Sequence, residues 1–285
     1  MSGTLLEVRD LSVEYASDRG PVSALRDVSL AVGAGRVTAL VGESGSGKST
    51  LGQAVLGLLP AAARVASGSI RLGDLEVRGL PERRMRALRG ARIALIPQDP
   101  TGSLNPVRTV GASIAETFRV HGHRDRGLIR RRVLELLERV GIDDPVTRAR
   151  QFPHELSGGM KQRVLIAAAI GLAPDLIVAD EPTSALDVTV QKTVLDLIDE
   201  LRRESGTGVL LITHDLAVAA DRADEVVVLR SGVVQESGRA SEVLAAPAAA
   251  YTRALLADAP ALSGVVERKS PDATTPALVE VTSLR

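Results

Sequence analysis

A glycine-rich loop that ends in a lysine and two hydroxyl residues carries the clearest chemical pattern in the sequence. It comprises Gly42, Glu43, Ser44, Gly45, Ser46, Gly47, Lys48, Ser49 and Thr50. Glycines let backbone amides turn towards phosphate oxygens, and a helix that follows presents its positive end to them. Lys48 would reach the terminal phosphates, and the Ser49 hydroxyl would face Mg²⁺. A plain glycine turn would explain neither residue, so the loop predicts a nucleotide-phosphate site.

Two adjacent carboxylates follow a short aliphatic segment. Asp180 and Glu181 come directly after Leu176 to Ala179. Ligands of open α/β sheets bind at the carboxyl ends of strands, so both side chains are suitably placed for phosphate chemistry. We expect Asp180 to hold Mg²⁺ through water and Glu181 to polarise the water that attacks the γ-phosphate. Without the glycine-rich loop, such a pair would more often be a solvated turn.

A serine and two glycines precede a long helical stretch. In the segment Leu156 to Arg163, Ser157 suits a helix N-cap, and Gly158 and Gly159 allow close approach of an anion. One nucleotide in one molecule does not need two phosphate cradles. The second cradle therefore predicts sites shared between two copies of the fold, whereas a simple helix cap would account for the serine alone.

Short aliphatic segments, separated by helical patterns, supply the elements that must position these residues. Leu5 to Val13 alternates apolar and polar residues like a half-exposed strand, and Val28 to Val32 is its expected partner. Further strand-like runs are Val37 to Val41, Ile93 to Ile96, Leu176 to Ala179, Val209 to Thr213 and Val226 to Leu229. Between Asp99 and Ser157 the pattern becomes helical, with an apolar stripe along Arg130 to Val140. We predict an α/β core with a helical insert.

Composition and charge exclude several classes of protein. The chain has 285 residues, 45% of them hydrophobic, and can bury a full core. Its 35 basic residues balance 35 acidic ones, so we expect no nucleic acid as the main partner. The absence of cysteine excludes disulfides, thiolate metal sites and cysteine nucleophiles.

The sequence contains no segment suited to crossing a membrane. Its longest apolar run, Val164 to Ala179, is shorter than the roughly 20 residues that a spanning helix needs, and Pro174 and Asp175 interrupt it. The N-terminus lacks a basic stretch followed by an apolar one. We expect a cytoplasmic protein, in which any transport function would act through a membrane partner.

The order of these motifs, from about Leu5 to about Leu256, resembles the ATP-binding cassette (ABC) family of transporter ATPases. The resemblance implies a P-loop NTPase core, with a mostly parallel sheet and an antiparallel N-terminal β-subdomain. It also implies a helical subdomain inserted before the signature helix, which Leu156 to Arg163 would begin. Tyr15 matches the aromatic residue that stacks on adenine. Gln98 matches the glutamine that contacts Mg²⁺ and senses the membrane partner.

The resemblance extends to the residues expected to act on ATP. Asp180 matches the metal-binding aspartate, Glu181 the catalytic glutamate and His214 the γ-phosphate contact. The remaining nucleotide contacts that it implies are Ser157, Gly158, Gly159 and Asp187, the last in a loop, Ser184 to Asp187, that links the two sites of a dimer. Taken singly, Tyr15, Gln98 and His214 would more often be packing or surface residues. Every matched position holds the active residue type, so we expect ATP hydrolysis with Mg²⁺, with Glu181, His214 and Lys48 as the catalytic residues.

Three further stretches resemble the di- and oligopeptide importer branch of this family, which also includes nickel and glutathione systems. They are Gln98 to Gly111, Phe152 to Glu155 and Tyr251 to Leu256. The resemblance implies a peripheral subunit on the cytoplasmic face of the membrane. Its partners would be membrane permease subunits, a second cassette and, through the permease, an extracytoplasmic solute-binding protein.

Two other interpretations stay open on the sequence alone. A soluble ABC ATPase could act on DNA or ribosomes, although the interval from Thr50 to Leu156 suits a compact helical subdomain better than the long coiled coils of DNA-repair relatives. A regulatory cassette could bind ATP without hydrolysing it, but the intact Glu181 and His214 argue against that. Copurification with permease subunits, ribosomes or DNA would separate these alternatives.

The end of the sequence suggests a second cassette. We assign residues 1–260 to one cassette, with its helical subdomain at about 99–160, and residues 261–277 to a linker. Leu278 to Leu284 lines up with Leu5 to Leu11 at leucine, glutamate, valine and leucine, so residues 278–285 would begin another cassette in a tandem fusion. A chance match between two short strand-like segments explains the similarity about as well.

Overall fold

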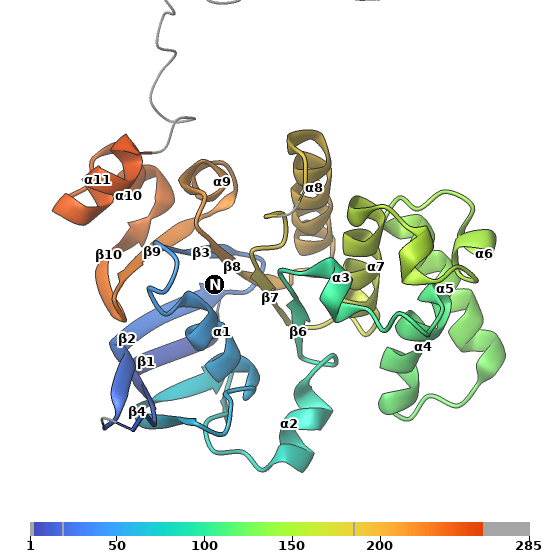
Figure 1. Cartoon of the computed structure of the whole chain (residues 1–285), viewed down its shortest axis with the longest axis horizontal. Coiled ribbons are helices and arrows are strands. Elements are labelled where there is room, and N and C mark those ends of the chain that lie inside the picture. The colour runs from blue at the N-terminus through green and yellow to red at the C-terminus, as the bar shows by residue number, and fades with distance from the viewer. Residues whose placement is uncertain (1–2, 19, 185, 259–285) are drawn as a thin grey trace, which may run out of the picture.

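An antiparallel sheet contains the first strands of the chain. The computed structural model describes residues 3–18, 20–184 and 186–258 (Figure 1). In this sheet the strand order is β2-β1-β4-β5. The strands are β1 (Thr4–Tyr15), β2 (Val22–Gly33), β4 (Ala63–Leu72) and β5 (Leu75–Glu76). Val8 of β1 pairs with Leu30 on one side and Ile70 on the other, which confirms the predicted pairing of the first two strands.

A six-stranded, mostly parallel sheet forms the centre of the molecule. Its strand order is β10-β9-β3-β8-β7-β6, with only β10 antiparallel to its neighbour. The strands are β3 (Val37–Val41), β6 (Ile93–Ile96), β7 (Leu176–Asp180), β8 (Gly208–Thr213), β9 (Glu225–Arg230) and β10 (Val233–Arg239). In register, Val41 pairs with Thr213 and Asp180 with Ile212, so the carboxyl ends of β3, β8 and β7 lie at one edge. This edge positions the motifs that follow the strands.

Helix α1 (Lys48–Leu56) lies between the two sheets (Figure 1). One buried cluster joins Leu51 and Val55 of α1 to Val8 of β1, Leu40 of β3 and Leu210 of β8. The opposite face of β3 and β9 is covered by α9 (Leu216–Arg222), α10 (Ala240–Ala245) and α11 (Ala250–Ala257). Alternate residues of the parallel strands therefore face different layers, as expected for strands buried on both faces.

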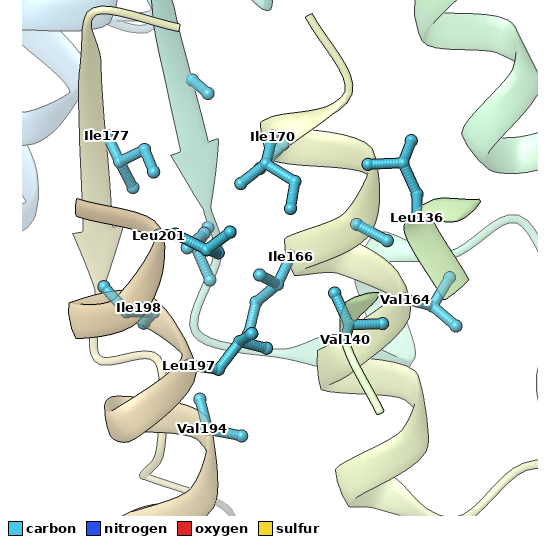
Figure 2. Close-up of a cluster of buried hydrophobic side chains, with 14 of the residues drawn as sticks. Leu136, Val140, Val164, Ile166, Ile170, Ile177, Val194, Leu197, Ile198 and Leu201 are labelled. Carbon is cyan, nitrogen blue, oxygen red and sulfur yellow. The ribbon is translucent and has the colours of Figure 1, made fainter. Parts of the chain in front are cut away.

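The helical insert contains α3 (Pro100–Ser103), α4 (Val110–Val120), α5 (Arg126–Arg139) and α6 (Pro145–Arg148), followed by a short 3₁₀ turn and α7 (Gly158–Ile170). It occupies one side of the molecule, beyond β6 and β7 (Figure 1). Figure 2 shows Leu136 of α5, Ile166 of α7, Ile177 of β7 and Leu201 of α8 (Val188–Ser205) in one buried cluster. The insert thus shares its hydrophobic core with the sheet, and the α/β fold with a helical insert is confirmed.

The remaining described helix is α2 (Glu82–Leu88), which lies between β5 and β6 in the chain. Across residues 3–18, 20–184 and 186–258, no helix combines the length and apolar character that a bilayer-spanning segment requires.

Candidate active site

The glycine-rich loop connects the end of β3 to the start of α1, as its sequence context predicts. Its first glycine lies against β9: a Cβ on Gly42 would come within 2.1 Å of the Leu229 carbonyl oxygen. At Gly47, which has a φ of 107° and immediately precedes α1, a Cβ would come within 2.8 Å of the Ala24 carbonyl oxygen. These two glycines let neighbouring backbone approach so closely that the loop turns directly into the helix.

Lys48, the first residue of α1, points back across the loop. Its Nζ donates hydrogen bonds to the carbonyl oxygens of Gly42, at 2.7 Å, and Glu43, at 2.8 Å. Burial lowers the pKa of Lys48, while the carboxylates of Glu181, Asp180 and Glu43 act in the opposite direction. The ammonium group is therefore held within a mostly buried ring of oxygen atoms.

Asp180 ends β7 opposite the start of α1. Its Oδ1 accepts a hydrogen bond of 3.5 Å from the Ser49 hydroxyl. Burial raises the pKa of Asp180, although the Ser49 hydrogen bond and the charge of Lys48 partly offset that effect. A partly buried carboxylate beside a hydroxyl offers hard oxygen donors that a divalent cation would favour.

These donors suit a hard divalent cation such as Mg²⁺. Within the described part of the chain, no three histidine, cysteine, aspartate or glutamate side chains converge as a metal site. Mg²⁺ does not require such a cage, because it takes one or two protein oxygens and completes its shell with substrate phosphates and water. Ser49 and Asp180 therefore fit a magnesium ion shared with a bound phosphate.

Glu181 is restrained through both its backbone and its side chain. Its φ is 45°, a left-handed conformation uncommon for residues other than glycine. Its Oε2 accepts a hydrogen bond of 2.9 Å from Gln98 Nε2, and its Oε1 lies 3.0 Å from His214 Nδ1. Gln98 follows β6 and His214 follows β8, the two neighbours of β7 in the sheet. Parallel strand order therefore brings these three residues together from distant parts of the sequence.

One cavity of about 980 Å³ joins the loop to these side chains. Its lining is Ser23, Ala24, Arg26, Ser44, Gly45, Gly47, Lys48, Ser49, Thr50, Gln98, Glu181, Ser184, His214 and Ser231. The predicted residues Gly42, Glu43, Ser46 and Asp180 are not among the lining residues, but Gly42 and Glu43 contact Lys48, and Asp180 contacts Ser49. The cavity is large and mostly polar, and it is open enough to admit a nucleotide.

One wall of this cavity is formed by residues that the sequence did not predict. Ser23, Ala24 and Arg26 lie on β2, and Ser231 lies in the turn after β9. The Arg26 guanidinium donates to the Ser231 carbonyl oxygen at 3.2 Å, and its backbone amide donates to Gly232 at 2.8 Å. No local motif marks these residues, because only the packing of β2 against that turn brings them to the loop.

Tyr15 lies at the end of β1, beside the end of the loop. Its hydroxyl is 3.4 Å from Thr50 Oγ1, and the residue packs against the cluster below α1. Tyr15 is not part of the cavity lining, although it lies next to it. Its predicted contact with adenine remains a prediction.

The second glycine motif lies away from the loop. Ser157 is the N-cap of α7 and accepts a hydrogen bond from the Met160 amide at 3.3 Å. Together with Gly159 it lines a separate cavity of about 190 Å³, which shares no residue with the larger one. Gly158 precedes Gly159 in the first turn of α7, and Asp187 is the N-cap of α8. Within one chain, the structure does not bring Ser157, Gly158, Gly159 and Asp187 to the glycine-rich loop.

A glycine-rich loop between β3 and α1, with acidic residues at the end of the parallel strand β7 in the same sheet, defines a P-loop nucleotide-binding cassette. Residues 25–184 match the ABC transporter family. The chain belongs to that family.

Two curated relatives are similar over most of this chain. The chain is 49% identical to the oligopeptide transport ATP-binding protein OppD of Mycobacterium bovis, over 90% of its own length and 42% of that protein. It is 42% identical to the dipeptide transport ATP-binding protein DppD of Escherichia coli, over 93% of its length and 81% of that protein. The chain thus spans less than half of the first relative and most of the second.

A solved structure shares the fold. It is a dimeric ATP-binding cassette, MJ0796, in a post-hydrolysis state bound to ADP and Pi. The TM-score is 0.74 at 26% identity, and the match covers 82% of this chain and 98% of that one.

The predicted second cassette at residues 278–285 lies outside the described residues and remains a prediction.

Proposed function

We propose that this chain is an ATP-hydrolysing subunit of an ABC importer for di- or oligopeptides. The observation that carries the proposal is the placement of Glu181 between Gln98 and His214, in the same cavity as Lys48 and Ser49. A carboxylate fixed from two sides beside a phosphate loop suits a group that must orient water for in-line attack.

The glycine-rich loop and the start of α1 bind the phosphates. Backbone amides of the loop and the positive end of the helix dipole favour anions at this point. The Lys48 ammonium now contacts the carbonyl oxygens of Gly42 and Glu43 and can extend towards the β- and γ-phosphates. Its position at the start of α1, against the loop, places a cation beside the proposed phosphate site.

Ser49, Asp180 and Gln98 hold Mg²⁺ in this proposal. When bound, the ion neutralises charge on the β- and γ-phosphate oxygens. The Ser49 hydroxyl supplies a neutral oxygen, and Asp180 supplies the negative charge. Because burial raises the pKa of Asp180, a neighbouring cation favours its ionised form and offsets the cost of burying that charge.

Glu181 acts as the general base. It accepts a proton from the attacking water while Gln98 and His214 hold its two carboxylate oxygens. His214 then contacts the γ-phosphate, and Tyr15, beside the end of the loop, stacks on adenine. The backbone strain at Glu181 is consistent with a functional constraint at this residue.

A second cassette completes the site. Ser157 and Gly159 line a separate cavity, and neither Gly158 nor Asp187 lines the cavity of the loop, so we assign their predicted nucleotide contacts to a partner. A dimeric cassette among the similar structures supports this arrangement. ATP would then bind between the loop of one cassette and the signature residues of the other.

Relatives named for oligopeptide and dipeptide transport support peptides over nickel or glutathione as the imported solute. The proposed partners are permease subunits in the membrane and, through them, an extracytoplasmic solute-binding protein. The chain would work at the cytoplasmic face of the membrane. Copurification tests this assembly: recovery of permease subunits is expected, whereas ribosomes or DNA in their place would contradict it.

The catalytic assignment is tested by Glu181→Gln in the purified complex with its partners. This variant keeps the side-chain size and removes the base, so ATP binding should persist while steady-state turnover is abolished. Glu200→Gln is the matched control, because Glu200 is exposed on α8 away from the cavity, and it should leave turnover unchanged. Unchanged turnover in Glu181→Gln would contradict the assignment.

A further inference from the structure

Helix α11, near the end of the described chain, contacts the glycine-rich loop. The hydroxyl oxygen of Tyr251 accepts a hydrogen bond of 3.3 Å from the backbone amide of Glu43. Residues 43 and 251 are separated by 208 positions, so local sequence cannot specify this contact. It connects the nucleotide loop to a segment to which the proposed function assigns no role.

Packing fixes the position of the Tyr251 side chain. The residue is 8% exposed and belongs to the buried cluster formed by β3, β9, α9 and α10. The guanidinium carbon of Arg230, at the end of β9, lies 4.7 Å from the centre of its ring. A side chain held by a hydrophobic cluster and a cation can present its hydroxyl at a constant position.

Helix α11 is itself anchored to β10. The Glu236 carboxylate accepts hydrogen bonds from the amides of Ala248, at 2.8 Å, and Ala249, at 3.1 Å. Ala249 is the N-cap of α11 and makes no side-chain cap hydrogen bond, so Glu236 fixes the start of the helix through the amides of the N-cap and of the residue before it. Partial burial acts to raise the pKa of Glu236, but its hydrogen bonds outweigh that effect and the pKa lies below the usual 4.5.

The contact restrains residue 43, whose carbonyl oxygen also contacts the catalytic lysine. The Glu43 amide is bound to Tyr251, while the Glu43 carbonyl oxygen accepts from Lys48 Nζ at 2.8 Å and from the Ser46 amide at 3.2 Å. Residue 43 is therefore held from outside the loop by α11 and from inside by the loop's own groups. In the first turn of the loop, both the amide and the carbonyl oxygen of Glu43 are therefore hydrogen-bonded.

We propose that Tyr251 is a positioning residue, which preorganises the first turn of the glycine-rich loop for nucleotide binding. Tyr251 acts through Glu43 and does not itself touch the nucleotide. A loop that is already in its binding conformation loses less conformational entropy when the phosphates arrive. The effect on nucleotide affinity rests on the proposed function, whereas the effect on loop order does not.

The test is Tyr251→Phe in the full-length chain, because this change removes the hydroxyl and keeps the ring in its cluster. We expect faster hydrogen exchange of the Glu43 amide in protein without nucleotide. We also expect the Kd for ATP with Mg²⁺ to rise about 2- to 10-fold, the usual range for one hydrogen bond. In the partnered complex the KM for ATP should rise while kcat stays nearly constant.

Val243→Ala is the matched control. Val243 lies on α10 in the same cluster as Tyr251. Among the described residues, no hydrogen bond links Val243 to the loop. It should lower thermal stability at least as much as Tyr251→Phe and leave both the Glu43 exchange rate and the Kd unchanged. If the control reproduces the loss of affinity, the effect is general destabilisation and the proposal is wrong.

The outcomes also separate this proposal from the proposed function. If the unmodified chain does not bind ATP with Mg²⁺, the proposed function fails, and the exchange rate of the Glu43 amide still decides the role of Tyr251. If Tyr251→Phe changes neither exchange nor affinity while the unmodified chain binds ATP, only the positioning role is overturned.

Discussion

Glu181 illustrates how single residues at this site are constrained. A residue held at positive φ costs of order 1–3 kcal/mol, so the surrounding structure must favour that conformation. Here the Glu181 amide donates to the Ile212 carbonyl oxygen at 2.8 Å, and both carboxylate oxygens are near polar partners. The strained backbone turns the carboxylate out of the strand direction and into the cavity.

Replacement of Gln98 by leucine tests this restraint at the scale of one residue. The substitution keeps the side-chain size but removes the donor to Glu181 Oε2 and, with it, the amide oxygen that we propose contacts Mg²⁺. A hydrogen bond to a charged group is worth about 1.5–3 kcal/mol, so kcat of the partnered complex should fall about 10- to 100-fold. Equilibrium binding of ATP by the isolated chain should change much less.

The exposed Gln235 of β10 provides the control for this substitution. Gln235→Leu makes the same chemical change on the surface, where Nε2 donates to the nearby Val233 carbonyl oxygen, and turnover should stay constant. Equal losses in the two variants would mean that the Gln98 hydrogen bond has no special role in turnover.

At the scale of elements, β9 and the glycine-rich loop approach each other without an intervening side chain. Gly42 tolerates this approach because it lacks a Cβ, and its φ of 153° lies in a region that glycine favours. The loop can therefore turn sharply at the end of β3 and direct its amides towards the cavity.

Gly42→Ala should disrupt this element contact. Its Cβ would lie 2.1 Å from the Leu229 carbonyl oxygen, so strand and loop must separate. We expect the free energy of unfolding to fall by roughly 2–5 kcal/mol and ATP binding to be lost. Chemical denaturation and calorimetric titration measure the two effects.

Gly73→Ala is the control for Gly42→Ala, because it introduces backbone strain without a steric clash. Gly73 has a φ of 57° in the turn between β4 and β5, and a Cβ there would meet nothing within 4 Å. Strain alone should cost about 1–2 kcal/mol and leave ATP binding intact. Equal destabilisation by the two variants would show that contact with β9 does not determine the choice of glycine at position 42.

At the scale of the whole molecule, the two glycine motifs lie on parts of the fold that are joined through one core. Ile166 of α7 and Ile177 of β7 belong to the same buried cluster, in which α5 and α8 also take part (Figure 2). The N-terminal end of α7, which carries Ser157 to Gly159, is therefore packed firmly against the sheet but does not reach the glycine-rich loop of the same chain. In the proposed function, a second cassette brings the two motifs together around one nucleotide.

Gly158→Asp tests this shared site. A Cβ at Gly158 would meet only Leu186, at 3.9 Å, so the fold should accept the substitution. The added carboxylate would repel a phosphate held by a partner's loop, and such a contact between like charges costs on the order of several kcal/mol. Turnover in the assembled complex should therefore fall at least about 100-fold. The isolated chain should bind ATP with an unchanged Kd, because its own loop is untouched.

Gly73→Asp adds the same charge to an exposed turn and serves as the control. Turnover should stay constant in this variant. Weaker ATP binding by the isolated Gly158→Asp chain would contradict a site divided between two cassettes and would favour a direct contact within one chain.

Much of the parallel sheet and most of the candidate site could be predicted from the sequence, because their signals are local. Apolar runs such as Val37 to Val41 can be recognised without knowing their neighbours, and the loop after that strand has a fixed spacing. Strands β4, β5 and β10 were not predicted, because β4 and β10 are mostly polar or half-exposed and β5 is very short. Tertiary pairing, rather than local pattern, determines those strands.

The sequence by itself determined the chemistry: the phosphate loop, the acidic pair at the end of β7, and the side chains of Gln98 and His214. Tertiary structure decided which groups meet. Strand order set Glu181 between Gln98 and His214, the packing of β2 brought Arg26 to the cavity, and α11 brought Tyr251 to the loop. The reason is physical, because a spacing motif encodes a turn of a few residues, whereas contacts across hundreds of positions depend on how the whole core packs.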